Sequence, residues 1–252
     1  MFLRNILLSQ GSTVVTPVTT YAASTSVLSG SQSFNCGSDS SLALGDGDKT
    51  SAIWFKTTSG AYSRIFSQGD QNVTDYYDVY MLGNGQIWAR ADQHSPSSNQ
   101  EWRTNATGFN DGDWHLLVVR WNSYGTYDIY IDNVSQAVTN SNVGSPTSLS
   151  AGADLYIGEQ SGGGSGGFVG ELGFGGFWDG TLTTGEMTTL YNGGDALCHG
   201  SLGSLTTNLV SYWHFADFTG HTTDELTDQE GSNNATNNGS ITFTGSGLDV
   251  SC

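Results

Sequence analysis

The chain has 252 residues, of which 24 are acidic and only 7 are Lys or Arg, so its formal net charge is −17. A surface this acidic repels phosphate groups, which argues against a nucleic-acid partner and against an anionic membrane surface. No apolar run approaches the length of a membrane span, so membrane insertion is not expected. The 35 Gly and only 3 Pro favour many short strands joined by tight turns.

Residues 1–30 are predicted to form a polar N-terminal arm, in which Thr13–Thr20 could add an edge strand. The hydrophobic stretch near the N-terminus contains only Ile6, Leu7 and Leu8. A secretory signal needs roughly seven to fifteen apolar residues, so export by that route is not expected. We expect the arm to serve in assembly with, or anchoring to, another protein.

The chain after the arm consists of short runs of strand-forming residues separated by turn residues. Residues 31–58 predict two strands, and Gly83-Asn84-Gly85 is a strong hairpin signal. Further strands are predicted at residues 65–67, 78–82, 86–91 and 101–104.

The segment Asp111–Asn133 predicts a β-hairpin at the centre of a sheet. Trp114–Trp121 carries apolar residues on both alternating faces, so this strand should have packed layers on both sides. Asn122–Gly125 is predicted as the hairpin loop. The return strand, Tyr127–Ile131, alternates between apolar and polar residues.

Thr183–Tyr191 is the one predicted helix, with Thr183 or Thr184 as its N-cap and Glu186 in its first turn. Residues 199–252 contain two further predicted strands. We interpret this C-terminal segment as completing the same domain, with a truncated second copy as the alternative. About 54 residues are few for an independent β-domain.

Three cysteines, Cys36, Cys198 and Cys252, leave at least one unpaired within the chain. Cys198 and Cys252 could form a bridge between the start and the end of the C-terminal segment. Their spacing matches no zinc motif.

The predicted hairpin resembles the D-G-x-W-H-x-L…W…I-Y-x-D-G signature of laminin-G-like domains, which belong to the concanavalin A-like lectin/glucanase superfamily. Asn133 replaces the usual final glycine. Further segments resemble the family in the same order: Ser33-Phe34-Asn35, Ser51–Lys56, Leu155–Gly158 and Phe168–Asn192.

The resemblance implies an all-β fold: an antiparallel two-sheet jelly-roll sandwich with one short helix. We expect an arm at 1–30, the sandwich at 31–198, and a C-terminal β segment at 199–252 that completes the sandwich or is appended to it. The fold hosts lectins, hydrolases, adhesion modules and virion proteins, so it does not by itself define a function.

Catalysis is not expected. Glycosidases of this fold place two carboxylates on one strand face. The only dense acidic run, Asp224–Glu230, puts its acidic residues at spacings that a strand would divide between two faces, and its polar surroundings indicate a loop. The single G-x-S-x-G match, Gly163–Gly167, lies in a predicted glycine-rich loop rather than between a strand and a helix, so it does not indicate a nucleophilic serine.

Calcium is the candidate cofactor, because laminin-G-like domains often bind it through loop aspartates. Asp70, Asp75 and Asp78 lie around one predicted loop, and Asp46 and Asp48 around another, so hard oxygen ligands are available. Asp70 and Asp75 are the preferred ligands. The alternative is that these aspartates are solvated turn residues.

Sugar binding would combine an exposed aromatic surface with polar hydrogen-bonding groups. Trp102 with Arg103, after a polar loop, is the preferred surface pair, and Tyr76 and Trp88 are further candidates. Both tryptophans could instead pack in the core.

Two functions remain. The first is a non-enzymatic structural protein on a virion surface, a bacteriophage capsid decoration protein held to the major capsid or another virion protein by residues 1–30. The alternative is a carbohydrate-binding adhesin or receptor-binding module at a cell surface or phage tail, with host-surface glycans as ligands. A homo-oligomer is compatible with either.

Overall fold

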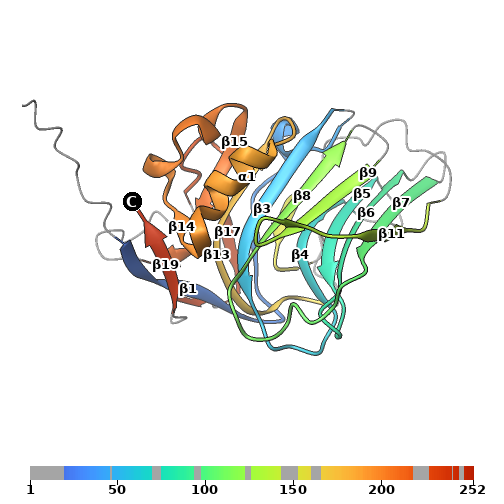
Figure 1. The fold of residues 1–252 in the computed structure, drawn as a ribbon, viewed down its shortest axis with the longest axis horizontal. Coiled ribbons are helices and arrows are strands. Elements are labelled where there is room, and N and C mark those ends of the chain that lie inside the picture. The colour runs from blue at the N-terminus through green and yellow to red at the C-terminus, as the bar shows by residue number, and fades with distance from the viewer. Residues whose placement is uncertain are drawn as a thin grey trace, which may run out of the picture.

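The computed structural model describes residues 20–45, 47–69, 75–93, 98–122, 126–142, 153–159, 166–217, 227–239, 241–243 and 247–252. These residues form two stacked β-sheets with one α-helix, α1 (Thr184–Tyr191), packed against the larger sheet (Figure 1). The predicted all-β sandwich with one short helix is confirmed.

The larger sheet has 11 strands and the smaller one 8. The larger sheet contains β1 (Thr20–Ser29), β3 (Lys49–Lys56), β8 (His115–Asn122), β9 (Thr126–Ile131), β10 (Val134–Ser135), β13 (Val169–Trp178), β14 (Ala196–Leu197), β15 (Leu209–His214), β16 (Ala216–Asp217), β18 (Thr242–Phe243) and β19 (Leu248–Ser251). The smaller sheet contains β2 (Ser33–Asn35), β4 (Ser63–Gln68), β5 (Tyr76–Met81), β6 (Ile87–Gln93), β7 (Ser98–Thr104), β11 (Val138–Asn140), β12 (Leu155–Ile157) and β17 (Thr236–Asn238).

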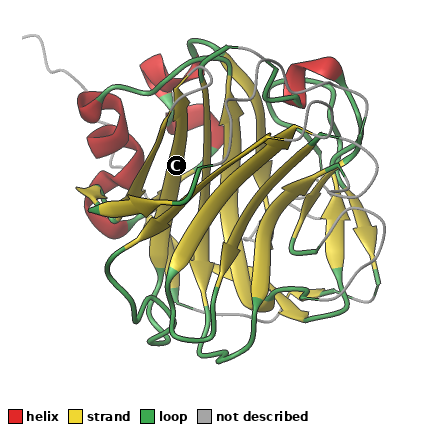
Figure 2. Cartoon of the chain, turned by 90° about the vertical axis from the view of Figure 1, so that its right-hand side faces the viewer, coloured by secondary structure: helices red, strands yellow, loops and turns green. Residues whose placement is uncertain are grey.

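The strand order is β10-β9-β8-β3-β13-β1-β19-β14 in the larger sheet and β11-β7-β6-β5-β4-β12-β2-β17 in the smaller one. Among the described strands, every pairing is antiparallel except that of β14 with β19. Figure 2 views the molecule from the side on which β5, β6 and β7 lie in Figure 1, and it shows helical segments at the margins of the strands. The short 3₁₀ segments are η1 (Ser40–Leu42), η2 (Asn192–Gly194), η3 (His199–Ser201) and η4 (Gly203–Thr206).

Two apolar cores lie on opposite sides of the larger sheet, and β8 contributes to both. Leu117, Val119 and Trp121 belong to the central core between the two sheets. Leu116 and Val118 belong to the peripheral core, where the larger sheet packs against α1. The prediction of a strand packed on both faces is therefore confirmed.

Polar contacts join the start of β8 to the turn that follows β9, at the end of the hairpin opposite its loop. Asp132 and Asn133 take positive φ angles of 52° and 63° in the turn after β9. Asn133 thus adopts the left-handed conformation that the family's glycine would provide. The Asp132 carboxylate accepts a hydrogen bond from the Leu116 amide at 2.9 Å and lies 2.7 Å from His115 Nδ1, so His115 is a hydrogen-bonded packing residue.

The helix begins as predicted. Thr183 is the N-cap of α1, and its hydroxyl accepts a hydrogen bond from the Glu186 amide at 3.3 Å. In return, the Glu186 carboxylate accepts one from the Thr183 amide at 2.7 Å, which completes a capping box. Met187 and Leu190 are the buried residues of this helix, and both join the peripheral core. No helix among the described residues is long and apolar enough to cross a membrane.

The C-terminal segment contributes strands to both sheets: β15 pairs with β13, β19 pairs with β1, and β17 pairs with β2. The N-terminal boundary differs from the expectation, because β1 already occupies residues 20–29 of the predicted arm and lies between β13 and β19. The position of β1 in the sheet is determined by its backbone pairing with β13 and β19, and its own residue pattern does not predict it. Residues 1–19 lie outside the described residues.

Cys198 and Cys252 form a disulfide, with a Cα–Cα distance of 5.3 Å, and Cys36 is buried with a free thiol. The bridge follows from strand register. Leu197 of β14 is paired with Ser251 of the parallel strand β19, so the next residue of each strand is a cysteine. The pairing that the sequence left open is thereby resolved.

Candidate ligand-binding face on the smaller sheet

The candidate site lies on the side of the smaller sheet that faces away from the central core. Successive residues of a strand point to opposite faces, so each strand contributes every second residue to this side. On β5 and β6, the residues between the candidates are apolar and belong to the central core. We call this side the outer face, and define it as Tyr62, Arg64, Tyr76, Asp78, Tyr80, Trp88, Arg90, Asp92, Glu101 and Arg103.

A row of aromatic rings crosses the strands of the outer face. The ring centroids of Tyr62 and Tyr80 are 4.9 Å apart, and those of Tyr80 and Trp88 are 5.5 Å apart. A guanidinium group stands at each end: Arg64 lies 4.9 Å from the Tyr62 ring and Arg103 lies 5.1 Å from the Trp88 ring. Strand register produces the row, because Tyr80, Trp88 and Arg103 are direct partners on β5, β6 and β7.

Beneath one end of the row lies a buried polar cluster. Asp78 Oδ2 accepts hydrogen bonds from the Tyr76 hydroxyl at 2.5 Å, the Tyr62 hydroxyl at 3.3 Å and Arg64 Nε at 3.3 Å. Burial raises the pKa of Asp78 to about 6, although Arg64 and these hydrogen bonds oppose the rise. Asp78 Oδ1 is buried and has no partner among the described residues. Burial, followed by the negative charge of Asp78, also raises the pKa of Tyr76.

The other charged groups of the outer face divide into paired and unpaired ones. Arg90 binds Asp92 through both Nε and Nη2. Arg103 and Glu101, two residues apart on β7, have no ion-pair partner within 4 Å among the described residues. Burial raises the pKa of Glu101, and the positive charges of Arg90 and Arg103 oppose that rise.

The structure brings together three of the four predicted sugar-binding residues. Tyr76, Trp88 and Arg103 all lie on the outer face. Trp102 does not: it packs against the central core, and its indole Nε1 has no partner among the described residues. The expectation that Trp102 and Arg103 form one surface pair is wrong, because adjacent residues of a strand point to opposite faces.

Several residues of this face are not predicted as sugar contacts, and Asp78 is expected only as a candidate calcium ligand. These residues are Tyr62, Arg64, Asp78, Tyr80 and Glu101. A signal was present for part of them. In Tyr76–Met81 the sequence YYDVYM alternates Tyr, Asp and Tyr with Tyr, Val and Met, so one face is more polar than the other. Arg64 carries no such signal, because the register between β4 and β5 shifts beside it.

The predicted calcium ligands are only partly described. Asp70 lies outside the described residues, and Asp75 directly precedes β5. Asp78 is buried and bound within the polar cluster of the outer face, so it is not a solvated loop ligand. Among the residues that the structure describes, no three His, Cys, Asp or Glu side chains are grouped as metal ligands would be. Calcium binding stays a prediction.

The acidic run that could have suggested catalysis has structural partners in its described part. Asp228 accepts hydrogen bonds from the backbone amides of Tyr212, Glu230 and Asn233, which fixes a turn beside β15. The carboxylate of Glu230 lies 2.7 Å from His199 Nε2. Asp224, Glu225 and Leu226 lie outside the described residues.

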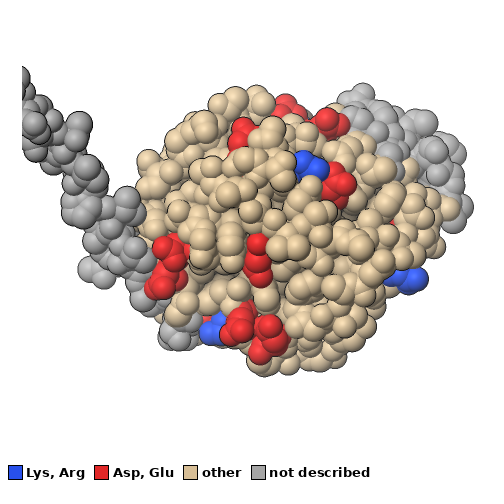
Figure 3. Space-filling model, in the orientation of Figure 1, with Lys and Arg blue, Asp and Glu red and all other residues tan. Residues whose placement is uncertain are grey.

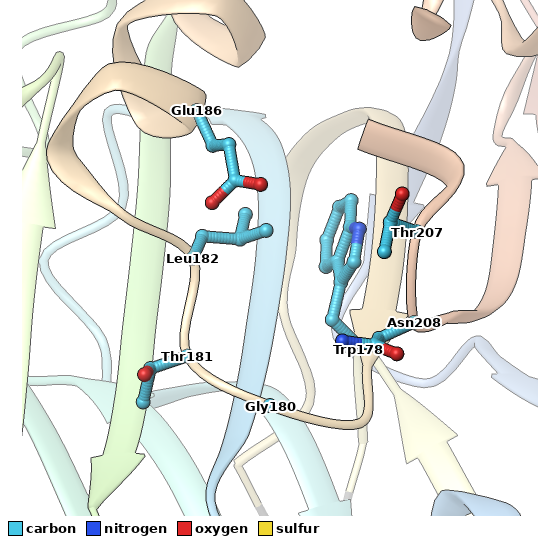
Figure 4. Close-up of a pocket in the computed structure, with 7 residues that line it drawn as sticks. All are labelled: Trp178, Gly180, Thr181, Leu182, Glu186, Thr207 and Asn208. Carbon is cyan, nitrogen blue, oxygen red and sulfur yellow. The ribbon is translucent and has the colours of Figure 1, made fainter. Parts of the chain in front are cut away.

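A small pocket lies between α1 and η4, far along the chain from the outer face (Figure 4). Its volume of about 40 Å³ is small beside the roughly 300–1,000 Å³ of ligand pockets. Polar groups at its wall have internal partners: Trp178 Nε1 donates to the Leu205 carbonyl and Glu186 caps α1. It has room for water rather than for a sugar. The pocket is lined by Trp178, Gly180, Thr181, Leu182, Glu186, Thr207 and Asn208.

Charged groups are sparse on the side of the molecule shown in Figure 3, where acidic side chains occur in several separate places and basic ones in few. The basic residues of the chain are not spread evenly. Of its 7 Lys and Arg, three arginines lie on the outer face, namely Arg64, Arg90 and Arg103. The outer face therefore holds a larger share of basic side chains than the rest of this acidic chain.

Comparison with known proteins supports the fold. A protein from Bacteroides ovatus to which carbohydrate binding is attributed superposes with a TM-score of 0.61 at 14% identity, over 89% of this chain and 59% of its own length. A Ruminococcus gnavus sialidase module, CBM40, in complex with α2,3-sialyllactose, superposes with a TM-score of 0.50 at 12% identity, over 69% of this chain and 98% of that module. No curated protein matches the chain significantly.

The family itself is recognised from sequence. The laminin G model of the concanavalin A-like lectin/glucanases superfamily matches residues 28–188, well over half of the chain. This range includes β2 to β13, hence the central hairpin and all strands of the outer face. With the two-sheet sandwich in place, the chain belongs to the laminin G-type branch of the concanavalin A-like lectin/glucanases superfamily.

Proposed function

We propose that this protein is a non-enzymatic glycan-binding module whose ligand lies across the outer face of the smaller sheet. The observation that carries the proposal is the row Tyr62–Tyr80–Trp88 with an arginine at each end. Aromatic rings contact the apolar C–H faces of sugars, and flanking polar groups bind the hydroxyls. Tyr62, Trp88 and Arg103 are partly exposed, so they offer both kinds of contact on one surface, while Tyr80 and Arg64 are buried and support them.

The buried cluster supports the same proposal because it holds the aromatic row in place. Tyr62 is fixed through its hydroxyl by Asp78, which is itself bound by Arg64 and Tyr76. A binding surface whose side chains are already ordered loses less conformational entropy when a ligand binds. The carbohydrate ligand of the CBM40 module is a further support, since that module shares the fold.

The setting in which the module works is part of the proposal. We propose that the protein works at a cell surface or outside the cell, as an adhesin or receptor-binding module. The disulfide between Cys198 and Cys252 supports this proposal, because such bridges persist in oxidising environments. Attachment to a virion through residues 1–30 stays a prediction, as does a homo-oligomer. Nothing in the described part of the chain supports capsid decoration over glycan binding.

The test is a glycan array with the full chain, followed by titration calorimetry on the sugars that bind. Trp88→Ala should weaken binding at least tenfold, because it removes the ring at the end of the row. Trp114→Ala is the matched control, since Trp114 packs against the peripheral core on the other side of the larger sheet. Thermal melting of both variants checks the fold.

Two results would contradict the proposal. One is the absence of binding to every glycan on the array. The other is binding that Trp88→Ala and Trp114→Ala reduce equally, which would place the ligand elsewhere.

A further inference from the structure

We propose, resting on the proposed function, that the ligand is a neutral sugar, and that Glu101 and Arg103 bind its hydroxyls beside the Trp88 ring. Glu101 and Arg103 are successive outward-facing residues of β7. Their Cα atoms are separated by roughly 6.6 Å, the distance of two residues along a strand. One sugar ring with its substituents can therefore contact both side chains.

The two side chains have complementary hydrogen-bonding chemistry. An ionised carboxylate only accepts hydrogen bonds, and a guanidinium group only donates them. A sugar hydroxyl does both, so a pair of neighbouring hydroxyls can donate to Glu101 and accept from Arg103. Because neither side chain has an ion-pair partner within 4 Å among the described residues, both are free to do this.

The Trp88 ring supplies the apolar half of the subsite. Its indole Nε1 donates to the Gln86 side chain at 3.0 Å, which fixes the orientation of the ring. The side chain is only partly buried, and Arg103 lies beside the ring as its direct partner on β7. A sugar in contact with the open part of the ring is thus within reach of Arg103 and Glu101.

Charge balance argues for a neutral rather than an acidic sugar. The outer face carries three arginines and three carboxylates, and two of the arginines, Arg64 and Arg90, are already paired with Asp78 and Asp92. A carboxylate on the sugar would gain Arg103 but would be repelled by Glu101 nearby. The net charge of −17 adds a weaker, more distant repulsion.

The test compares each neutral sugar with an acidic counterpart of the same shape. The probes are oligosaccharides of glucose, galactose and mannose, each with its C6-oxidised uronic acid form, together with lactose and sialyllactose. Binding to the full chain is measured by calorimetry at pH 7.5 and 0.15 M salt, where charges more than about 8 Å apart are largely screened. At least one neutral probe should bind ten or more times tighter than its acidic counterpart.

Two variants test the assigned residues. Arg103→Gln should lower the affinity for the neutral sugar at least tenfold, because a charge-assisted hydrogen bond is lost. Glu101→Gln should reduce the discrimination against the acidic counterpart at least threefold, because the repulsion is removed. The charge-matched controls, Lys49→Gln and Glu171→Gln, change residues that pair elsewhere in the fold and should leave both affinities within twofold of the wild type.

The outcomes separate this inference from the proposed function. Binding that depends on Trp88 but prefers the acidic probes would overturn the neutral-sugar assignment and leave the glycan-binding module intact. Equal effects of Glu101→Gln and Glu171→Gln would show that overall charge, not Glu101, sets the preference. Failure of every probe to bind would overturn both proposals.

Discussion

Arg64 and Asp78 form an ion pair, with 3.3 Å between Arg64 Nε and Asp78 Oδ2, in which the side chains are only 9% and 2% exposed. Both lie on the outer face, away from either apolar core. Charges removed from water to this extent interact strongly, and the loss of one leaves the other without compensation. The pair therefore contributes both to the candidate site, through the Tyr62 hydroxyl bound by Asp78, and to the stability of the smaller sheet.

Replacing Arg64 should destabilise the protein markedly. We expect Arg64→Met to lower the free energy of unfolding at pH 7.5 by about 3–5 kcal/mol, because Asp78 would stay buried without its cation. Lys49→Met is the control: its partner Asp179 is 66% exposed, so the loss should stay below about 1 kcal/mol. Urea unfolding of both variants measures the difference, and equal losses would contradict the interpretation.

The stability of the wild type should depend on the protonation of Asp78. Its pKa is raised to about 6 in the folded state, against about 4 in an unfolded chain. Between these values the folded protein keeps a proton that the unfolded chain has lost, so the free energy of unfolding falls as pH rises through this window. The slope from this group is at most about 1.4 kcal/mol per pH unit.

Asp78→Asn cannot titrate, so it serves as the reference for that measurement. The difference in free energy of unfolding between wild type and variant should change from pH 4 to pH 6 and level off above pH 7. Urea titrations across this range measure it. A difference that is constant with pH would show that the pKa of Asp78 is not raised on folding.

Reduction of the disulfide should release the C-terminal strand. Cys198 and Cys252 are separated by 54 residues, and closing a loop of this length stabilises a fold by about 4 kcal/mol in the chain-entropy account. We expect a reducing agent to lower the melting temperature of the wild type. The Cys198→Ser/Cys252→Ser variant should melt at the lower temperature with or without it, and any response of this variant would point to Cys36 instead.

The capping box of α1 should contribute a smaller amount. Thr183→Ala removes the hydroxyl that accepts from the Glu186 amide and should cost about 1 kcal/mol, or about 2–4 °C in melting temperature for a domain of this size. Thr184→Ala changes the exposed neighbouring residue and should have little effect. Equal shifts for the two variants would mean that the cap does not stabilise the helix.

The sequence predicts most of the fold because its strongest signals are local. Trp114–Trp121 shows apolar residues on both faces, and β8 does face two cores. Thr183 and Glu186 carry the capping box at the required spacing. The strand β1 has no comparable signal in its own residues, since its position depends on backbone pairing with β13 and β19, which are distant in sequence.

The candidate site is only partly predictable for the same reason. Tyr76, Trp88 and Arg103 attract attention as residue types, but their common face depends on the register of β5, β6 and β7. Trp102 has the same chemistry as Trp88 and lies on the other side. Only the pairing of strands distinguishes the two tryptophans.

The neighbouring positions of β1 and β19 also make the chain suitable for circular permutation. Thr20 is directly paired with Ser251, so a short linker could join these two points of the larger sheet. New ends could be opened at Gly193, an exposed residue after α1 with a φ of 71°. The outer face lies on the other sheet, so a permuted protein would present the same row of aromatic rings from a reordered chain.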